Sequence, residues 1–199
     1  MQLVILDTEY TSWEGSMERG WNGPDEHREL VQISAIKIYD FATLNKTEFF
    51  SVYTKPIVNP LLSKYFIELT GITQSKLDRV GLEINEGIKL FSDFVKDCHV
   101  LSWGPDIDVI NYNCDLLDIN IKLEYKKSSD IRDIFNKYDI KTRLYNSGTI
   151  NSFIDRPTLL IPGRAHNALS DCVSMLCALC KLQETVGEEN LLQTIYNLD

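Results

Sequence analysis

Acidic side chains and one histidine stand at places in this sequence where regular structure is expected to begin or end. Asp7 and Glu9 directly follow the apolar run at residues 3–6, which is typical of a buried strand. Because positions i and i+2 of an extended chain project to the same side, both carboxylates can face one point. Hard oxygen ligands of this kind suit Mg²⁺ or Mn²⁺, and two such ions about 4 Å apart are used in in-line phosphoryl displacement. Such a pair is also common on a solvated surface, so other residues must support a metal site.

A second group of acids follows the strand expected at residues 99–103. Asp106 and Asp108 lie where this strand leads into a helix, and α/β proteins gather ligand groups at the ends of their strands. Either residue could instead be an acid that only stabilises the start of the helix.

The third group is His166 and Asp171. The histidine stands just before or inside the first turn of an expected helix, and Asp171 lies where the apolar stripe of that helix begins. A buried carboxylate without a partner is costly, and a metal ion would supply that partner. The alternatives are a salt bridge for Asp171 and a helix-capping or surface role for His166.

The elements that must position these groups alternate between strand and helix. Strands are predicted at residues 3–6, 30–39, 47–52 and 99–103, and helices at 61–69, 83–97, 106–113, 167–186 and 189–197. Residues 129–135 are typical of a strand or of a strand-to-helix junction, and residues 150–160 show no clear pattern. Three early strands, expected to be antiparallel neighbours, followed by alternating helices and strands predict an α/β fold with a mixed sheet flanked by helices.

Nothing in the sequence divides the chain. There is no internal repeat, linker or break in composition, so we expect one domain over residues 1–199. Within it, residues 12–29 are an irregular insertion near the first acids, and residues from about 186 to 199 form a helical end.

Composition restricts the class of protein and of partner. The 199 residues are 44% hydrophobic and 25% charged, as in an ordinary globular domain. A formal net charge of −9 has the wrong sign for a protein that wraps duplex nucleic acid, so a phosphate-bearing partner must be held locally. Five cysteines, an odd number in apolar stretches, suit a reducing compartment, and no apolar run approaches the roughly 20 residues that cross a bilayer. We therefore expect a cytoplasmic protein without a membrane span.

Taken together, the acids and the histidine form a pattern with a known counterpart. The sequence resembles the DEDDh branch of the DnaQ-like 3′-to-5′ exonucleases, whose pattern is Asp-x-Glu, a middle Asp, and His-x₄-Asp. Residues 29–37 look like the second strand of that family, and Leu-Thr-Gly-Ile at 69–72 is similar to a segment that it contains. The resemblance covers residues 1 to about 185, and Ser-Trp-Gly at 102–104 looks closest to the KapD-like and Eri-like members, which act on RNA more often than on DNA.

This resemblance implies an RNase H-like fold and a set of roles. Two Mg²⁺ or Mn²⁺ ions would be held by four carboxylates, those of Asp7, Glu9, Asp106 and Asp171. His166 would act as the general base, and hydrolysis of the terminal phosphodiester would release nucleoside 5′-monophosphates. The partner would be single-stranded or 3′-overhanging nucleic acid, with RNA slightly favoured over DNA. Substrate-binding residues by the same resemblance are Thr8, Tyr10 and Thr11, with Phe66 or Ile72 stacking near the terminal base.

Two features depart from the family pattern. The family usually has two residues between the glycine of the middle motif and its aspartate, whereas one residue separates Gly104 from Asp106 and three separate it from Asp108. We favour Asp106, because Val109 and Ile110 then fall three and four residues later, where the family has its apolar helix pair. The other departure is the long 12–29 insertion, which is either a flap beside the site or a structural excursion.

Other functions remain open at this level. The chain could be a binding or regulatory module that keeps the fold with little turnover, although a pure binder would not need negative charge around a phosphate. It could also be a metal phosphoesterase for small molecules such as dinucleotides. Trp103 is expected to be a core aromatic, and the Lys and Arg residues at 126–127 and 132–143 could contact a phosphate backbone or simply be solvated.

Overall fold

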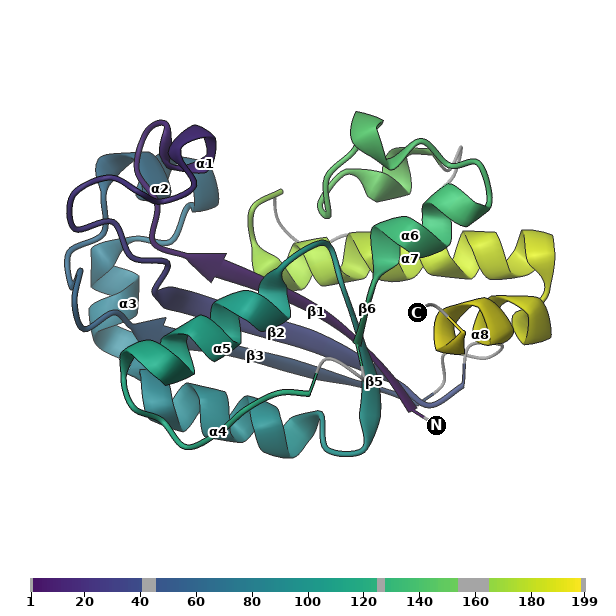
Figure 1. The fold of residues 1–199 in the computed structure, drawn as a ribbon, viewed down its shortest axis with the longest axis horizontal. Coiled ribbons are helices and arrows are strands. Elements are labelled where there is room, and N and C mark those ends of the chain that lie inside the picture. Colours follow the sequence, from purple (N-terminus) through teal and green to yellow (C-terminus); the bar gives the residue numbers. More distant parts are fainter. Residues whose placement is uncertain (1, 41–45, 125–127, 154–164, 198–199) are drawn as a thin grey trace.

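The computed structural model describes residues 2–40, 46–124, 128–153 and 165–197. Within these residues the chain forms a mixed six-stranded sheet in the order β4-β3-β2-β1-β5-β6 (Figure 1). β1 is antiparallel to β2 and β2 to β3, whereas β5 lies parallel to β1, β6 to β5, and the short β4 to β3. The predicted fold class is therefore confirmed. The strands are β1 Gln2–Tyr10, β2 Leu30–Ile38, β3 Thr47–Lys55, β4 Leu82–Glu83, β5 Cys98–Ser102 and β6 Ser128–Asp130.

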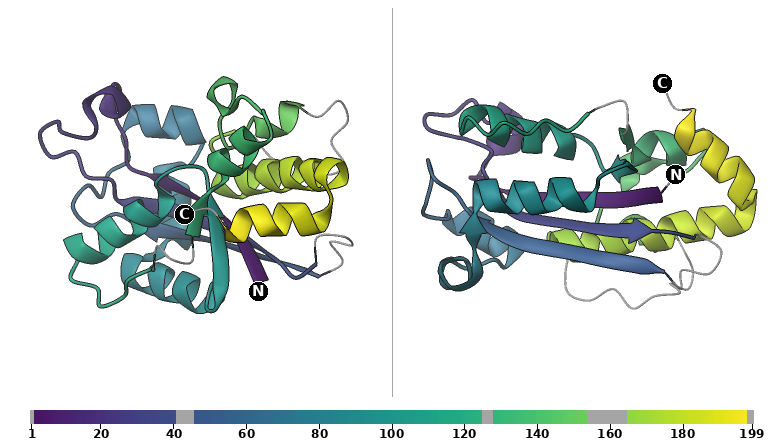
Figure 2. Two further views of the ribbon diagram at one scale, coloured as in Figure 1. Left: turned by 45° about the vertical axis from the view of Figure 1, so that its right-hand side comes forward. Right: turned by 90° about the horizontal axis from the view of Figure 1, so that it is seen from below.

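Helices cover both faces of this sheet, so that α5 and α7 lie on opposite sides of the strands (Figure 2). None of the helices among the described residues is long and apolar enough to cross a membrane. The helices are α1 Ser16–Arg19, α2 Lys64–Thr70, α3 Gln74–Val80, α4 Ile84–Phe94, α5 Asp106–Leu116, α6 Ile131–Lys137, α7 Ala168–Val186 and α8 Glu188–Tyr196, with 3-10 turns η2 Thr142–Leu144 and η3 Ile150–Phe153.

Alternation along β1 decides which face each acid occupies. Leu3 and Ile5 are buried in the core beneath α7, whereas Val4 and Leu6 are buried in the core beneath α4 and α5. Because successive side chains of a strand point to opposite faces, Asp7 continues the row of Leu3 and Ile5. The first acids therefore emerge on the side of the sheet that α7 covers.

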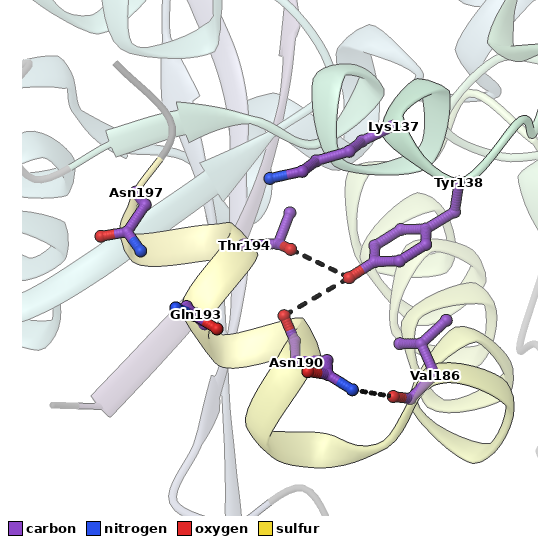
Figure 3. Close-up of a pocket in the computed structure, with 7 residues that line it drawn as sticks. All are labelled: Lys137, Tyr138, Val186, Asn190, Gln193, Thr194 and Asn197. Carbon is purple, nitrogen blue, oxygen red and sulfur yellow. Dashed lines mark hydrogen bonds between the residues drawn. The ribbon is translucent and has the colours of Figure 1, made fainter.

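Helix α8 closes the C-terminal end of the described chain against α6. The Tyr138 hydroxyl lies 2.9 Å from Thr194 Oγ1, and Asn190 Nδ2 donates to the Val186 carbonyl at 2.8 Å (Figure 3). A hollow of about 460 Å³ lies between the two helices, and Lys137 is the sole charged residue among the described residues that line it. None of these described residues is a carboxylate or a histidine, so the chemistry must be sought elsewhere.

The 12–29 insertion is held against neighbouring segments by hydrogen bonds and contains one turn of helix, α1. Ser63 Oγ donates to the carbonyl of Ser12 at 2.5 Å, and Thr11 Oγ1 accepts from the amide of Glu29 at 2.9 Å. The Glu29 carboxylate is fully buried and accepts from three consecutive backbone amides, at 2.7 Å from Ile57, 2.8 Å from Val58 and 2.5 Å from Asn59. These contacts tie the end of the segment to the loop after β3.

We expect Glu29→Ala to be one of the most destabilising changes outside the core. Loss of the carboxylate leaves three amides without their acceptor, and hydrogen bonds to a charged group contribute about 1.5–3 kcal/mol each, so a fall of about 3 kcal/mol or more in the free energy of unfolding is expected. Denaturant titration followed by circular dichroism measures it. Glu14→Ala, at an exposed position of the same segment, is the matched control and should change the midpoint little. Equal midpoints for the two variants would contradict the anchoring role.

Candidate active site

Three carboxylates from two distant parts of the chain meet beside the end of β1. Asp7 and Glu9 extend from β1, and Asp171 lies in the first turn of α7. All three are buried, and one oxygen from each lies within 4.8 Å of the others. They line a cavity of about 410 Å³, which we call the acidic cavity.

Asp106 joins the same cavity from the far face of the sheet. It is the first residue of α5, and its Oδ1 accepts from the backbone amide of Thr8 at 3.0 Å and from Thr8 Oγ1 at 2.6 Å. These two bonds connect the start of α5 to the middle of the Asp-x-Glu pair. Asp108, the alternative third acid, is exposed on α5 and does not line the cavity.

The start of α7 is set by polar contacts in the sheet. Asn167 caps the helix by accepting from the amide of Ser170 at 3.4 Å, and the amide of Ala168 donates to Gln32 Oε1 at 3.3 Å. Gln32 lies opposite Glu9 in the register of β1 and β2 and is 1% exposed. His166 precedes the cap with φ of 62°, a left-handed conformation, and lines the acidic cavity. Gln32 was not identified from the sequence, although a polar residue inside an apolar strand was a visible signal.

The loop between η2 and η3 holds Asp171 from its other side. Ser147 Oγ donates to Asp171 Oδ2 at 3.1 Å. A Cβ built on Gly148 would lie 2.6 Å from Asp171 Oδ1, so a side chain there would displace the carboxylate. Asp171 Oδ1 is buried and makes no well-formed hydrogen bond with the described residues. A buried carboxylate oxygen without a donor is what a bound cation would satisfy.

Burial and mutual repulsion make this cluster unfavourable as bare anions. Burial is the largest cause that raises the pKa of Asp106 to about 7 and that of Asp171 to about 6, although hydrogen bonds from Thr8 and Ser147 act in the opposite direction. Burial, followed by repulsion from the neighbouring carboxylates, also raises the pKa values of Asp7 and Glu9 well above their ordinary range. A divalent cation would reverse this penalty, and the residues present therefore fit such an ion.

We expect the chain without divalent ions to lose stability as the pH rises. Asp106 and Asp171 have folded pKa values of about 7 and about 6 against an ordinary value of 3.8. The folded chain therefore binds these protons more tightly than the unfolded chain does, so the stabilisation is present below pH 3.8 and is lost by about pH 7. Thermal melts in EDTA at about pH 5.5 and 8 measure the fall, which should be smaller in Asp106→Asn. Mn²⁺ at pH 8 should raise the melting temperature, and a wild-type melt unchanged by Mn²⁺ would contradict a cation site.

The remaining wall of the acidic cavity is largely aromatic and apolar. The 12–29 segment contributes Trp13, Ser16, Met17 and Trp21, so the insertion lies beside the site, and the other non-acidic lining residues include Tyr65, Leu69, Trp103, Arg132 and Asn146. Trp103 packs partly against the core at Phe135, with ring centroids 6.5 Å apart, but it also faces the cavity. The sequence predicted the 12–29 insertion as either a flap beside the site or a structural excursion, and Arg132 as either a phosphate contact or a solvated charge. Trp103 was expected in the core, and Tyr65, Leu69 and Asn146 were not assigned to the site.

The predicted substrate-binding residues divide into two groups. Thr8 and Tyr10 line the cavity, whereas Thr11 is buried and bonded to the backbone of the 12–29 segment. Phe66 and Ile72 do not line the cavity, because each is 1% exposed in a core cluster beneath α2. This placement corrects the stacking role predicted for them.

The cause of that difference is the orientation of α2. Residues four apart share a helix face, so Tyr65 and Leu69 point to the cavity together. Phe66 lies one position further round and packs into the core. Helix α2 therefore offers Tyr65 and Leu69 as the neighbours of a bound molecule.

Comparisons with known proteins identify the family of this chain. The profile of the RNase T family, described as exonuclease, matches residues 4–179. A Caenorhabditis elegans protein named 3′-5′ exonuclease crn-4 is 27% identical over 90% of this chain and 62% of its own length. A human protein named 3′-5′ exoribonuclease 1 is 26% identical over 85% of this chain and 48% of its own length. The chain thus spans less than two thirds of either relative.

Solved structures share the fold. The nuclease domain of 3′hExo, described as a DEDDh family member bound to rAMP, superposes with a TM-score of 0.77 at 23% identity and covers 94% of each chain. The profile match extends over most of the sequence and includes Asp7, Glu9, Asp106, His166 and Asp171. The chain therefore belongs to the RNase T family of exonucleases.

Proposed function

We propose that this chain is a metal-dependent 3′-5′ exonuclease that hydrolyses the terminal phosphodiester of RNA or DNA and releases nucleoside 5′-monophosphates. The observation that carries this proposal is the convergence of four buried carboxylates and His166 on one cavity. The names of the two curated relatives, both 3′-5′ exonucleases by name, support the same reaction.

In the proposed reaction each group has one task. Asp7, Glu9, Asp106 and Asp171 would hold two Mg²⁺ or Mn²⁺ ions. When bound, ions of this kind lower the pKa of the attacking water and stabilise charge on the leaving oxygen. His166 accepts the proton of that water from its position at the cavity wall.

The same cavity would hold the terminal nucleotide. Thr8 and Tyr10, which flank the acids in the sequence, line the cavity, and Tyr65 and Leu69 line it from α2. Base stacking on aromatic side chains is tolerant of sequence, which suits an enzyme that removes one nucleotide after another.

We expect His166→Ala to slow hydrolysis by at least about tenfold, since a positioned general base typically contributes a factor of 10² to 10⁴ and solvent can replace part of it. The melting temperature should still rise with Mn²⁺, because the four carboxylates remain. Initial rates with and without the substitution, together with that melt, make the measurement. If the Mn²⁺ response disappears together with the rate, His166 is a metal ligand and not the base.

The substrate proposed is single-stranded or 3′-overhanging nucleic acid, with RNA slightly favoured. The human relative is named an exoribonuclease, and the 3′hExo domain is described with rAMP bound, which supports RNA. The test is incubation with 5′-labelled DNA and RNA oligonucleotides, with Mn²⁺ or EDTA, followed by electrophoresis. Stepwise shortening from the 3′ end that requires the metal is expected. Binding without shortening would instead indicate a regulatory module, and cleavage of dinucleotides alone would indicate a small-molecule phosphoesterase.

A further inference from the structure

A second hollow of about 350 Å³ adjoins the acidic cavity. We call it the α6 hollow, because α6 and the η2 turn supply most of its walls. Trp103 and Arg132 line both spaces and so form their common boundary. The residues lining the α6 hollow are Trp103, Asp130, Arg132, Asp133, Asn136, Thr142, Arg143 and Tyr145.

Arg132 is held in place at this boundary. Its Nε donates to Asp130 Oδ1 at 2.9 Å and to Oδ2 at 2.8 Å, and its Nη2 also bonds Asp130. The guanidinium packs over Gly104, where an added Cβ would lie 3.3 Å from Nη2. Nη1 donates to no residue in the described part of the chain, and the side chain is 44% exposed to solvent. The arginine is therefore fixed on one edge and has donors left on the other.

Arg143 supplies a second cation that lines the α6 hollow. It lies exposed in η2, and this turn is fastened to α6 because Thr142 Oγ1 donates to Asn136 Oδ1 at 2.8 Å. Two acids also line the hollow, Asp130, which Arg132 pairs, and Asp133. The hollow thus has balanced charge beside a cavity rich in carboxylates, in a chain of net charge −9. A phosphate in the α6 hollow would therefore have arginine side chains near it as well as carboxylates.

Another part of the wall of the acidic cavity contains no cation among the described residues that line it. There the 12–29 segment and α2 present Trp13, Met17, Trp21, Tyr65 and Leu69. Figure 1 shows α1 and α2 over one side of the end of β1, and α6 on the other. Among the described lining residues, Trp103 and Arg132 therefore mark the side of the acidic cavity that best suits a charged strand.

We propose that the α6 hollow binds the nucleotides on the 5′ side of the scissile bond, with Arg132 and Arg143 donating to their phosphates. This inference rests on the proposed exonuclease function. Trp103 and Tyr145 provide aromatic faces for the bases, as in other sequence-tolerant single-strand grooves. The arginines then make turnover depend on the length of the strand.

The test compares two substrates of the same reaction. The p-nitrophenyl ester of thymidine 5′-monophosphate carries no nucleotide beyond the scissile bond, whereas a dT octamer fills the α6 hollow. For Arg143→Ala we expect the ratio of kcat/KM on the octamer to kcat/KM on the ester to fall at least about fivefold. The slope of log KM for the octamer against log KCl concentration should fall by about 0.7, the value for one lost phosphate contact on a single strand. Arg143→Lys, which keeps the charge, should retain most of the salt slope.

The control is Arg79→Ala, at an exposed position in the last turn of α3. It should leave the ratio unchanged. Arg132→Ala should lower the ratio further than Arg143→Ala, because Arg132 lies at the mouth of the acidic cavity. If the enzyme is active but neither its substrate ratio nor its salt slope responds to Arg143→Ala, the α6 hollow does not bind these nucleotides. The proposed exonuclease function would still stand. A wild-type chain that hydrolyses neither of these substrates, and does not shorten the labelled RNA oligonucleotide either, refutes both.

Discussion

Replacing Asp7 by Asn should remove at least about a hundredfold of the hydrolytic rate while the chain stays folded. Asp7 is buried at the centre of the cluster, with one of its oxygens within 4.8 Å of Glu9 and Asp171. An amide of the same shape keeps the packing but loses the charge, and metal-ion stabilisation of the transition state contributes several kcal/mol. Because the other carboxylates repel Asp7, the variant without metal should melt no lower than wild type. Single-turnover rates and thermal melts with and without Mn²⁺ are the measurements.

Asp93→Asn, an exposed acid on α4, is the matched control for the loss of one charge. It should keep full activity and the full rise of melting temperature with Mn²⁺. If Asp7→Asn were fully active, the acidic cavity would not be the site of hydrolysis. If it were inactive but kept the Mn²⁺ response, Asp7 would act in some way other than holding the ion.

The positions of the acids could be read from the sequence because local rules decide them. The apolar run before Asp7 predicts a buried strand, and the period of two then places Asp7 and Glu9 on one side. The apolar stripe of α7 likewise predicts that Asp171 faces the sheet. What brings these acids together is the parallel pairing of β5 with β1 and the packing of α7 across β1 and β2. The family resemblance supplied that long-range information.

The groups around the acids could not be read in the same way, because their roles depend on contacts between distant segments. Ser147 reaches Asp171 from a loop whose path no local pattern predicts. Arg132 belongs to a stretch of scattered charges, and only the fold places it beside Trp103. The choice between Tyr65 and Phe66 depended on the rotation of a two-turn helix about its axis. A shift of one position in that helix moves a side chain from the cavity wall into the core.

Replacing each of the two acids at the start of α5 by asparagine should give an equally clear difference. We expect Asp106→Asn to lower hydrolysis by at least about a hundredfold and Asp108→Asn to change it by less than about twofold. Asp106 is 6% exposed and bonded to Thr8, whereas Asp108, two residues later, is exposed on the far side of the helix start. Both lie in the first turn of α5, so each substitution removes the same favourable charge from that helix end.

Comparing these two variants separates the effect of lost charge at the start of α5 from the effect on catalysis. Any loss common to both variants belongs to the helix terminus, and the difference between them belongs to the cavity. Asp106→Asn should also weaken the Mn²⁺-induced rise in melting temperature, because one of the four cavity carboxylates is lost. The Asp106 assignment is wrong if Asp108→Asn alone abolishes turnover, since an exposed side chain would then have to move into the cavity when metal and substrate bind.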